Sequence, residues 1–244
     1  AYGVANQLST QALSVSNIFL QASNPQIVKS FGAGEKENSY KLANLISRFS
    51  FYVLFLFSAP VIININFILD IWLKDVPVYA DVFCQLLLMN FLIGVISNPI
   101  ITLIQATGEI RKFQIVNGTL FILNIPLAFF LLEIGCPPYS IFFGLIGITF
   151  IGVIVKLYFI NSLDTFPLRK WLSEVLVNLL IVVALSLMSI YVIHELFFFQ
   201  AELSIAISSF LASFLVILLI TYFFGLSKTE RKYILKFILN SLRV

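Results

Sequence analysis

The sequence predicts an all-α integral membrane protein of about seven transmembrane helices, and three observations support this fold class. First, 60% of the residues are hydrophobic and 11% are charged, with a mean hydropathy of +1.01; soluble domains average about 45–50% apolar and about 25% charged residues. Second, 244 residues suffice for about seven spans of roughly 20 residues with short loops. Third, the charged residues gather between the apolar stretches.

Seven stretches are expected to be the spans, and the loops between them are too short to form a separate soluble domain. These stretches are residues 6–27, 45–69, 82–104, 114–133, 140–161, 173–193 and 203–225. The residues after the last span, 227–244, predict a basic amphipathic tail on the membrane surface. Ser227 and Glu230 have the spacing of a helix capping box, which would begin that tail.

The first span is more polar than the others, and its polar residues repeat on one face. At about 100° per residue, an arc of roughly 140° collects amides and hydroxyls. Its members are Gln7, Thr10, Gln11, Ser14, Asn17, Gln21 and Asn24. Such groups are tolerated inside a membrane where they face protein or a water-filled cavity. The arc therefore predicts a cavity wall, and interhelical hydrogen bonding is the alternative.

Small residues flank this arc at near-heptad spacing, where a neighbouring helix can approach closely. They are Ala5, Ser9, Ala12, Ser16 and Ser23. Pro25 follows Asn24 and removes a backbone donor, so the helix is expected to kink or end there. Gly32 and Gly34 are expected to open the next loop.

Three later spans contain prolines, and each proline should bend its helix because it frees a backbone carbonyl. They are Pro60, Pro99 and Pro126. Bent helices are common where transporters change shape. We therefore predict hinges at these residues, and static kinks that improve packing are the alternative.

Basic residues give the topology. Fourteen of the fifteen Lys and Arg residues lie in the odd-numbered loops, close to them or in the tail, and Lys74 is the exception. By the positive-inside rule, residues 30–44, 105–113, 163–171 and the C-terminus are cytoplasmic. The chain then enters the membrane from outside, and an odd number of further spans would precede it in a protein with a cytoplasmic N-terminus. Trp72, in the first outer loop, has the place of an interfacial anchor.

Four motifs follow one another along the chain: residues 1–7 (AYGVANQ), 24–30 (NPQIVKS), 72–73 with 76–77 (WL and VP) and 105–110 (QATGEI). In this order they resemble the polysaccharide-transporter branch, with its O-antigen and capsule flippases, of the multidrug/oligosaccharidyl-lipid/polysaccharide (MOP) exporter superfamily. The resemblance extends to about residue 160. It implies a MATE-like fold of two six-helix lobes around a central cavity, often with two extra C-terminal helices. Residues 1–161 would be part of the C-terminal lobe, with five spans, and 162–226 the two additional spans; the chain would hold spans eight to fourteen.

The resemblance implies a flippase of the bacterial inner membrane that moves a lipid-linked oligosaccharide by alternating access, for O-antigen, lipopolysaccharide or capsule biosynthesis. The implied partners are an isoprenoid pyrophosphate oligosaccharide, membrane lipids and other polysaccharide-assembly proteins, with no nucleic acid, no cofactor and no enzyme activity. The polar arc would contact sugars, through Gln7, Gln11, Ser14, Asn17, Gln21 and Asn24. Arg48 and Lys156, which lie in or near spans, are candidates for binding the pyrophosphate. The alternative is that their side chains extend to the lipid headgroups at the membrane surface.

The positions of the carboxylates and the sizes of the outer loops bear on two alternative functions. All twelve Asp and Glu residues lie in loops or at span ends, whereas a cation-coupled small-molecule (multidrug) exporter of the same superfamily needs a buried acid. A membrane-embedded glycan polymerase or ligase would need a large outer loop, and no predicted outer loop is large.

One His and two Cys cannot supply the four ligands of a structural zinc site. Cys84 and Cys136 both lie towards the outer side, and the sequence leaves a disulfide between them open.

Overall fold

The computed structural model describes residues 1–197 and 203–232, and these residues form helices and connecting segments without any strand. The chain divides into two compact units, Ala1–Val175 and Leu176–Val244. The predicted all-α membrane fold is therefore confirmed. Of the predicted amphipathic tail, residues 227–244, the part 233–244 lies outside the described residues.

The first unit begins with a long antiparallel pair, α1 (Tyr2–Gly32) and α2 (Lys36–Ile63). Gly34, in the turn between them, has a φ of +84°, a conformation that favours glycine. The loop was predicted at this place. The sequence predicted that α1 kinks or ends at Pro25. The helix does not end there but continues through Pro25 to Gly32. Proline removes one hydrogen bond, and in a membrane helix neighbouring groups can compensate for that loss.

The rest of the first unit consists of shorter helices joined by bends and loops. They are α3 (Ile65–Trp72), α4 (Ala80–Val95), α5 (Asn98–Ala106), α6 (Arg111–Ile122), α7 (Asn124–Glu133), α8 (Ser140–Leu163) and α9 (Leu168–Trp171), followed by the π-helix η1 (Leu172–Val177). Gly108, just after α5, has a φ of +80°, the left-handed conformation that commonly follows the last turn of a helix.

The predicted spans that contain Pro60, Pro99 and Pro126 are each divided into two helices. The α2–α3 break falls at Asn64, four residues after Pro60. The α4–α5 break lies just before Pro99, and the α6–α7 break at Leu123 precedes Pro126. The second and third breaks thus lie beside Pro99 and Pro126, whereas α2 continues through Pro60 and breaks only at Asn64. Movement about any of these breaks stays a prediction.

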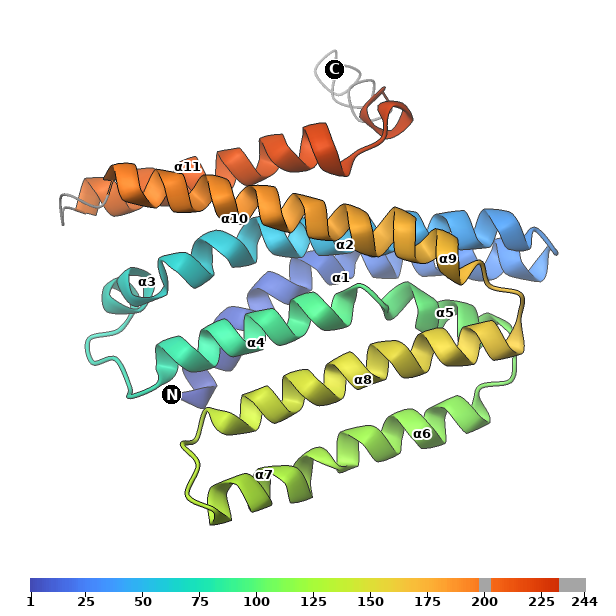
Figure 1. The fold of residues 1–244 in the computed structure, drawn as a ribbon, viewed down its shortest axis with the longest axis horizontal. Helices are drawn as coiled ribbons and strands as arrows, with labels where there is room; N and C mark the ends of the chain where they lie inside the picture. The colour runs from blue at the N-terminus through green and yellow to red at the C-terminus, as the bar shows by residue number, and fades with distance from the viewer. Residues whose placement is uncertain (198–202, 233–244) are drawn as a thin grey trace. The chain divides into compact units, whose positions relative to one another are not determined.

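Helix α1 lies at the centre of this unit. It packs against α2, α4 and α5, while α8 packs against α4 and α5 and separates them from α6 and α7. At the end where α1 begins, a buried cluster joins Ala5 to Ile65, Leu69 and Cys84. The loops after α1, α5 and α8 lie at the opposite end (Figure 1). These are the basic loops that the sequence predicts to be cytoplasmic.

Six helical stretches are long and apolar enough to cross a membrane, among the residues that the structure describes. They are Lys36–Ile63, Ala80–Ala106, Arg111–Glu133, Ser140–Leu163, Leu168–Val192 and Ile207–Gly225. They overlap the second to seventh predicted spans, although the first of them, Lys36–Ile63, begins and ends earlier than the predicted 45–69. The first predicted span, α1, is 31 residues long and does not meet this criterion, which agrees with its polar arc.

The second unit contains α10 (Asn178–Phe197), α11 (Leu203–Ile220) and the π-helix η2 (Thr221–Gly225), which pack against one another. After η2, the backbone N–H of Ser227 donates to Glu230 Oε2 at 2.7 Å, and the N–H of Glu230 donates to Ser227 Oγ at 3.3 Å. This reciprocal pair confirms the capping box.

Cys84 and Cys136 are both free thiols, so the structure contains no bridge between them.

Candidate functional site on the polar face of the first helix

The small residues of α1 form its packing face. Ala5, Ser9 and Ser16 are fully buried, and the hydroxyl of Ser16 donates to the carbonyl of Ser50 on α2 at 2.8 Å. Short side chains let the α1 and α2 backbones approach closely, which makes this interhelical bond possible. The predicted role in helix packing agrees with the burial of these three residues, whereas Ala12 and Ser23, the other two of the predicted set, are half-buried.

The polar arc lies largely outside this packing face. Gln7, Gln11, Ser14 and Gln21 are exposed, and Asn17 is half-buried. The Ser14 hydroxyl donates to the carbonyl of Gln11 at 2.7 Å, within its own helix. The structure therefore leaves the glutamine amides of the arc on the surface of the first unit. Their contact with a substrate stays a prediction.

Asn24 differs from the rest of the arc because it contacts another helix. Its Oδ1 accepts a hydrogen bond of 2.9 Å from the hydroxyl of Thr102 on α5. Asn24 is half-buried, and Thr102 is 5% exposed. Asn24 thus takes part in interhelical hydrogen bonding, which was the alternative to the predicted cavity wall for the polar arc.

An open hollow of about 260 Å³ lies between the first part of α1 and α3. It is lined by Gln7, Leu8, Gln11, Ile68 and Trp72. The sequence placed Trp72 in an outer loop as a membrane anchor, and the structure places it at the end of α3, beside two residues of the polar arc. No sequence spacing connects residues 7–11 with 68–72. The bend at Asn64 brings them together.

The two basic candidates lie on different helices. Lys156, on α8, is 7% exposed, and its Nζ donates to the hydroxyl of the fully buried Ser97 at 3.0 Å. Ser97 is the residue at the α4–α5 break. Arg48 is half-buried on α2. Lys156 is thus placed inside the helix packing beside a bend, and a role for it or Arg48 in pyrophosphate binding stays a prediction.

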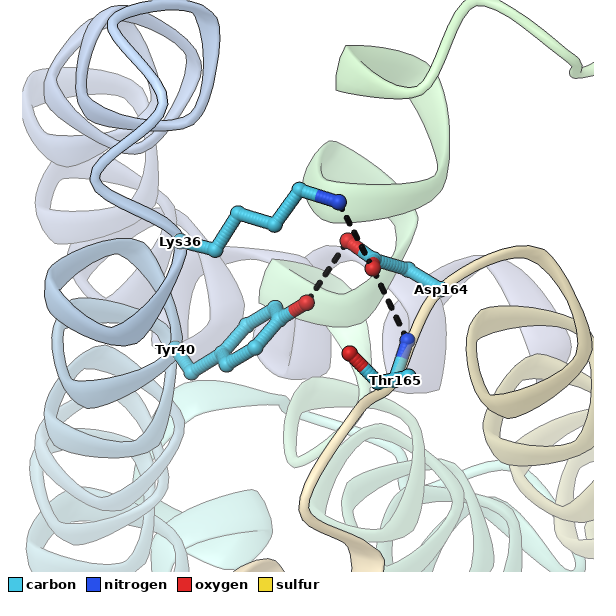
Figure 2. Close-up of polar contacts among 4 residues, drawn as sticks. All are labelled: Lys36, Tyr40, Asp164 and Thr165. Carbon is cyan, nitrogen blue, oxygen red and sulfur yellow. Dashed lines mark hydrogen bonds and ion pairs between the residues drawn. The ribbon is translucent and has the colours of Figure 1, made fainter.

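A polar network at the basic end of the unit was not foreseen from the sequence. Asp164, directly after α8, accepts hydrogen bonds from Lys36 Nζ at 2.9 Å and from Tyr40 Oη at 2.6 Å, and its Oδ1 also accepts the backbone N–H of Thr165 at 2.8 Å. Figure 2 shows Lys36 and Tyr40 pointing from α2 towards this carboxylate. The ring of Phe166 meets Tyr40 edge to face. Because more than 120 residues separate the partners, no local pattern predicts the network.

The network changes the acidity of Asp164, whose side chain is 5% exposed. Burial by itself raises a carboxyl pKa. Here the hydrogen bonds from Tyr40, Lys36 and Thr165 and the charge of Lys36 together outweigh burial, and they hold the pKa of Asp164 below its ordinary value of 3.8. The carboxylate therefore stays ionised at neutral pH and ties the first basic loop to the segment after α8.

Helices long and apolar enough to cross a membrane, among the residues that the structure describes, indicate a multi-pass membrane protein. The chain belongs to the MatE family, whose family model matches residues 1–130, more than half of its length. It is therefore a membrane transporter of the MOP superfamily, the superfamily that the sequence resemblance implied. No curated protein and no solved structure gives a significant match to the chain.

Proposed function

We propose that this transporter is a flippase that moves a lipid-linked oligosaccharide across the bacterial inner membrane by alternating access, in the assembly of O-antigen or capsule. The observation that carries the proposal is the exposed, uncharged polar face of α1. Lys29 is the first charged residue of the chain, so this face offers amides and hydroxyls alone. Such groups both donate and accept hydrogen bonds, as the hydroxyls of a sugar require.

The cation-coupled small-molecule exporter is the second candidate within the same superfamily. It needs an acid within the membrane that can hold a proton or a sodium ion. Asp81 and Glu133 lie in the first turn of α4 and the last turn of α7. Glu174 lies in the second turn of the apolar stretch Leu168–Val192, where it is exposed and accepts a hydrogen bond of 2.9 Å from the Asn44 amide. This distribution favours the flippase for the part of the chain that the structure describes.

Depletion of the protein tests the proposal. Cells depleted of a flippase should accumulate lipid-linked glycan in the cytoplasmic leaflet, and the protein supplied from a plasmid should reverse this. Normal glycan export together with increased sensitivity to small toxic compounds would instead assign the protein to the multidrug exporters.

A variant connects the assay to the polar face. Gln21→Leu should reduce rescue, because it removes an exposed amide of the arc, while Gln26→Leu is the matched control because Gln26 is exposed on the same helix outside the arc. Equal rescue by both variants at equal protein levels would count against the polar face as the substrate path.

A further inference from the structure

The hollow between α1 and α3 combines two kinds of side chain that the sequence assigned to separate roles. Gln7 and Gln11 supply exposed amides one helical turn apart. Trp72 supplies an indole ring that is 44% exposed. Leu8 and Ile68 complete the lining with aliphatic groups. Ligand sites commonly combine aromatic and aliphatic walls with a few polar groups that fix orientation.

The bend in the second helix forms this hollow. Pro60 lacks an N–H, and the helix stops four residues later, where the backbone N–H and the side-chain amide of Asn64 both donate to the carbonyl of Pro60, at 3.1 and 3.0 Å. Helix α3 then starts in a new direction. Its Leu69 is fully buried in the cluster beside α1, whereas Trp72 stays exposed at the margin. The α2–α3 bend thus holds the indole beside the glutamines.

The chemistry of the lining selects the ligand class. None of the five lining residues is charged, so the hollow offers amide and indole N–H donors but no cation to balance the charge of a phosphate. A lipid tail would make no use of the two amides. A pyranose ring presents C–H groups on one face, which can pack against the indole, and hydroxyls at its edge, which can bond the amides. The hollow therefore matches an uncharged sugar ring.

We infer that Gln7, Gln11 and Trp72 form a saccharide-binding subsite, with Trp72 as the ring against which the sugar stacks. The inference rests on the proposed function and adds to it a residue beyond the polar arc. The subsite lies at the end of the first unit where α1 begins and α3 ends, opposite the basic loops (Figure 1). By the predicted topology this is the outer end, where a translocated glycan leaves the transporter.

The two tryptophans of the chain allow a direct measurement of binding. Trp171 is 1% exposed and lies on the short helix α9. In a Trp171→Phe variant of the full chain, purified in detergent, all indole emission comes from Trp72. The probe is the mixture of saccharides released by mild acid from the lipid-linked glycans of the source cells. We expect a saturable change in emission intensity and wavelength on addition of this mixture.

Substitutions then identify the subsite. In the Trp171→Phe background, Gln7→Ala and Gln11→Ala should each weaken saccharide affinity by about three- to tenfold, the loss expected for one net hydrogen bond. Gln26→Ala, exposed on the same helix outside the hollow, should leave affinity unchanged. The sugar-free emission of all three variants should agree, which shows that the fold around Trp72 is intact.

The inference is overturned if the emission does not respond to the saccharides, or if the lipid fraction left after hydrolysis gives the response instead. Either result can occur while depletion still causes lipid-linked glycan to accumulate, and the proposed function then stands without this subsite. Absence of that accumulation would overturn the proposed function itself. A saccharide response that Gln7→Ala and Gln11→Ala both leave unchanged would also overturn the subsite, because the sugar would then bind away from the two amides.

Discussion

At the residue scale, neighbouring positions of α1 have opposite environments. Ser16 is fully buried against α2, while Asn17 is half-buried and Gln21 is exposed. The helix period places these side chains on different faces. Substitution of either face therefore probes a different property of the protein, packing in one case and substrate contact in the other.

Leucine substitutions should separate these properties. Ser16→Leu should lower the amount of folded protein, because overpacking a close helix contact costs about 1–3 kcal/mol. Asn17→Leu and Gln21→Leu should keep normal levels and reduce transport. The measurements are folded yield by size-exclusion chromatography and lipid-linked glycan accumulation in depleted cells. Poor folding of the polar-arc variants with normal transport per folded molecule would assign the arc to packing.

The ionised carboxylate of Asp164 predicts a pH-dependent stability. Because its pKa in the folded protein lies below the ordinary value of 3.8, the stabilisation is fully present above that value and is lost as pH falls through the folded pKa. Asp164→Asn should therefore lower stability at pH 7 by about 1–3 kcal/mol, as expected for hydrogen bonds to a charged group.

Thermal unfolding in detergent, followed at pH 7 and below pH 3.8, measures this difference. The wild type and Asp164→Asn should converge at the acidic end. Tyr40→Phe removes one of the partners of the carboxylate and should give a smaller loss at pH 7. A difference that stays constant over the whole pH range would show that the charge of Asp164 does not stabilise the fold.

At the element scale, the broken helices are the main feature. The breaks near Pro60, Pro99 and Pro126 divide three predicted spans, and Lys156 bonds Ser97 at the second break. A proline break costs hydrogen bonds within the helix, and neighbouring groups compensate in membrane proteins. At this break the Ser97 hydroxyl donates to the backbone carbonyl of Gly94 at 3.1 Å, and the same hydroxyl accepts from Lys156 of α8.

If Pro99 and Pro126 act as hinges, Pro→Ala at either residue should slow transport and leave folded protein levels unchanged, because alanine restores the helical N–H and stiffens the bend. Transport rates in reconstituted vesicles, normalised to folded protein, give the comparison. Unchanged rates in both variants would identify the bends as static features of packing.

At the scale of the whole molecule, the basic residues and the fold agree on one orientation. The loops after α1, α5 and α8 share one end of the first unit (Figure 1). Lys36, near the first of these loops, bonds Asp164 in the third. By the positive-inside rule we predict that this end of the unit faces the cytoplasm, with Lys74 in the loop after α3 as the one exception among the basic residues.

Cysteine labelling tests this orientation in a variant in which Cys84 and Cys136 are replaced. Ala33→Cys, in the exposed turn after α1, should resist an impermeant thiol reagent in intact spheroplasts and react after lysis. Asp75→Cys, in the exposed loop after α3, should react in both preparations. Strong labelling of Ala33→Cys from outside would reverse the topology.

The sequence by itself determined the all-α membrane fold, the bends near its prolines, the two faces of α1 and the capping box at Ser227. Each depends on hydrophobicity, helix period or backbone chemistry within a few neighbouring residues, so it can be read locally. Only the tertiary structure decided that Asn24 bonds Thr102, that Lys156 is buried beside Ser97, that Asp164 joins Lys36 and Tyr40, and that Trp72 lies beside Gln7 and Gln11. The hydrogen-bonded partners among these residues lie between 59 and 128 positions apart in the sequence. Such pairs depend on how the helices pack in three dimensions, which hydrophobic periodicity does not encode.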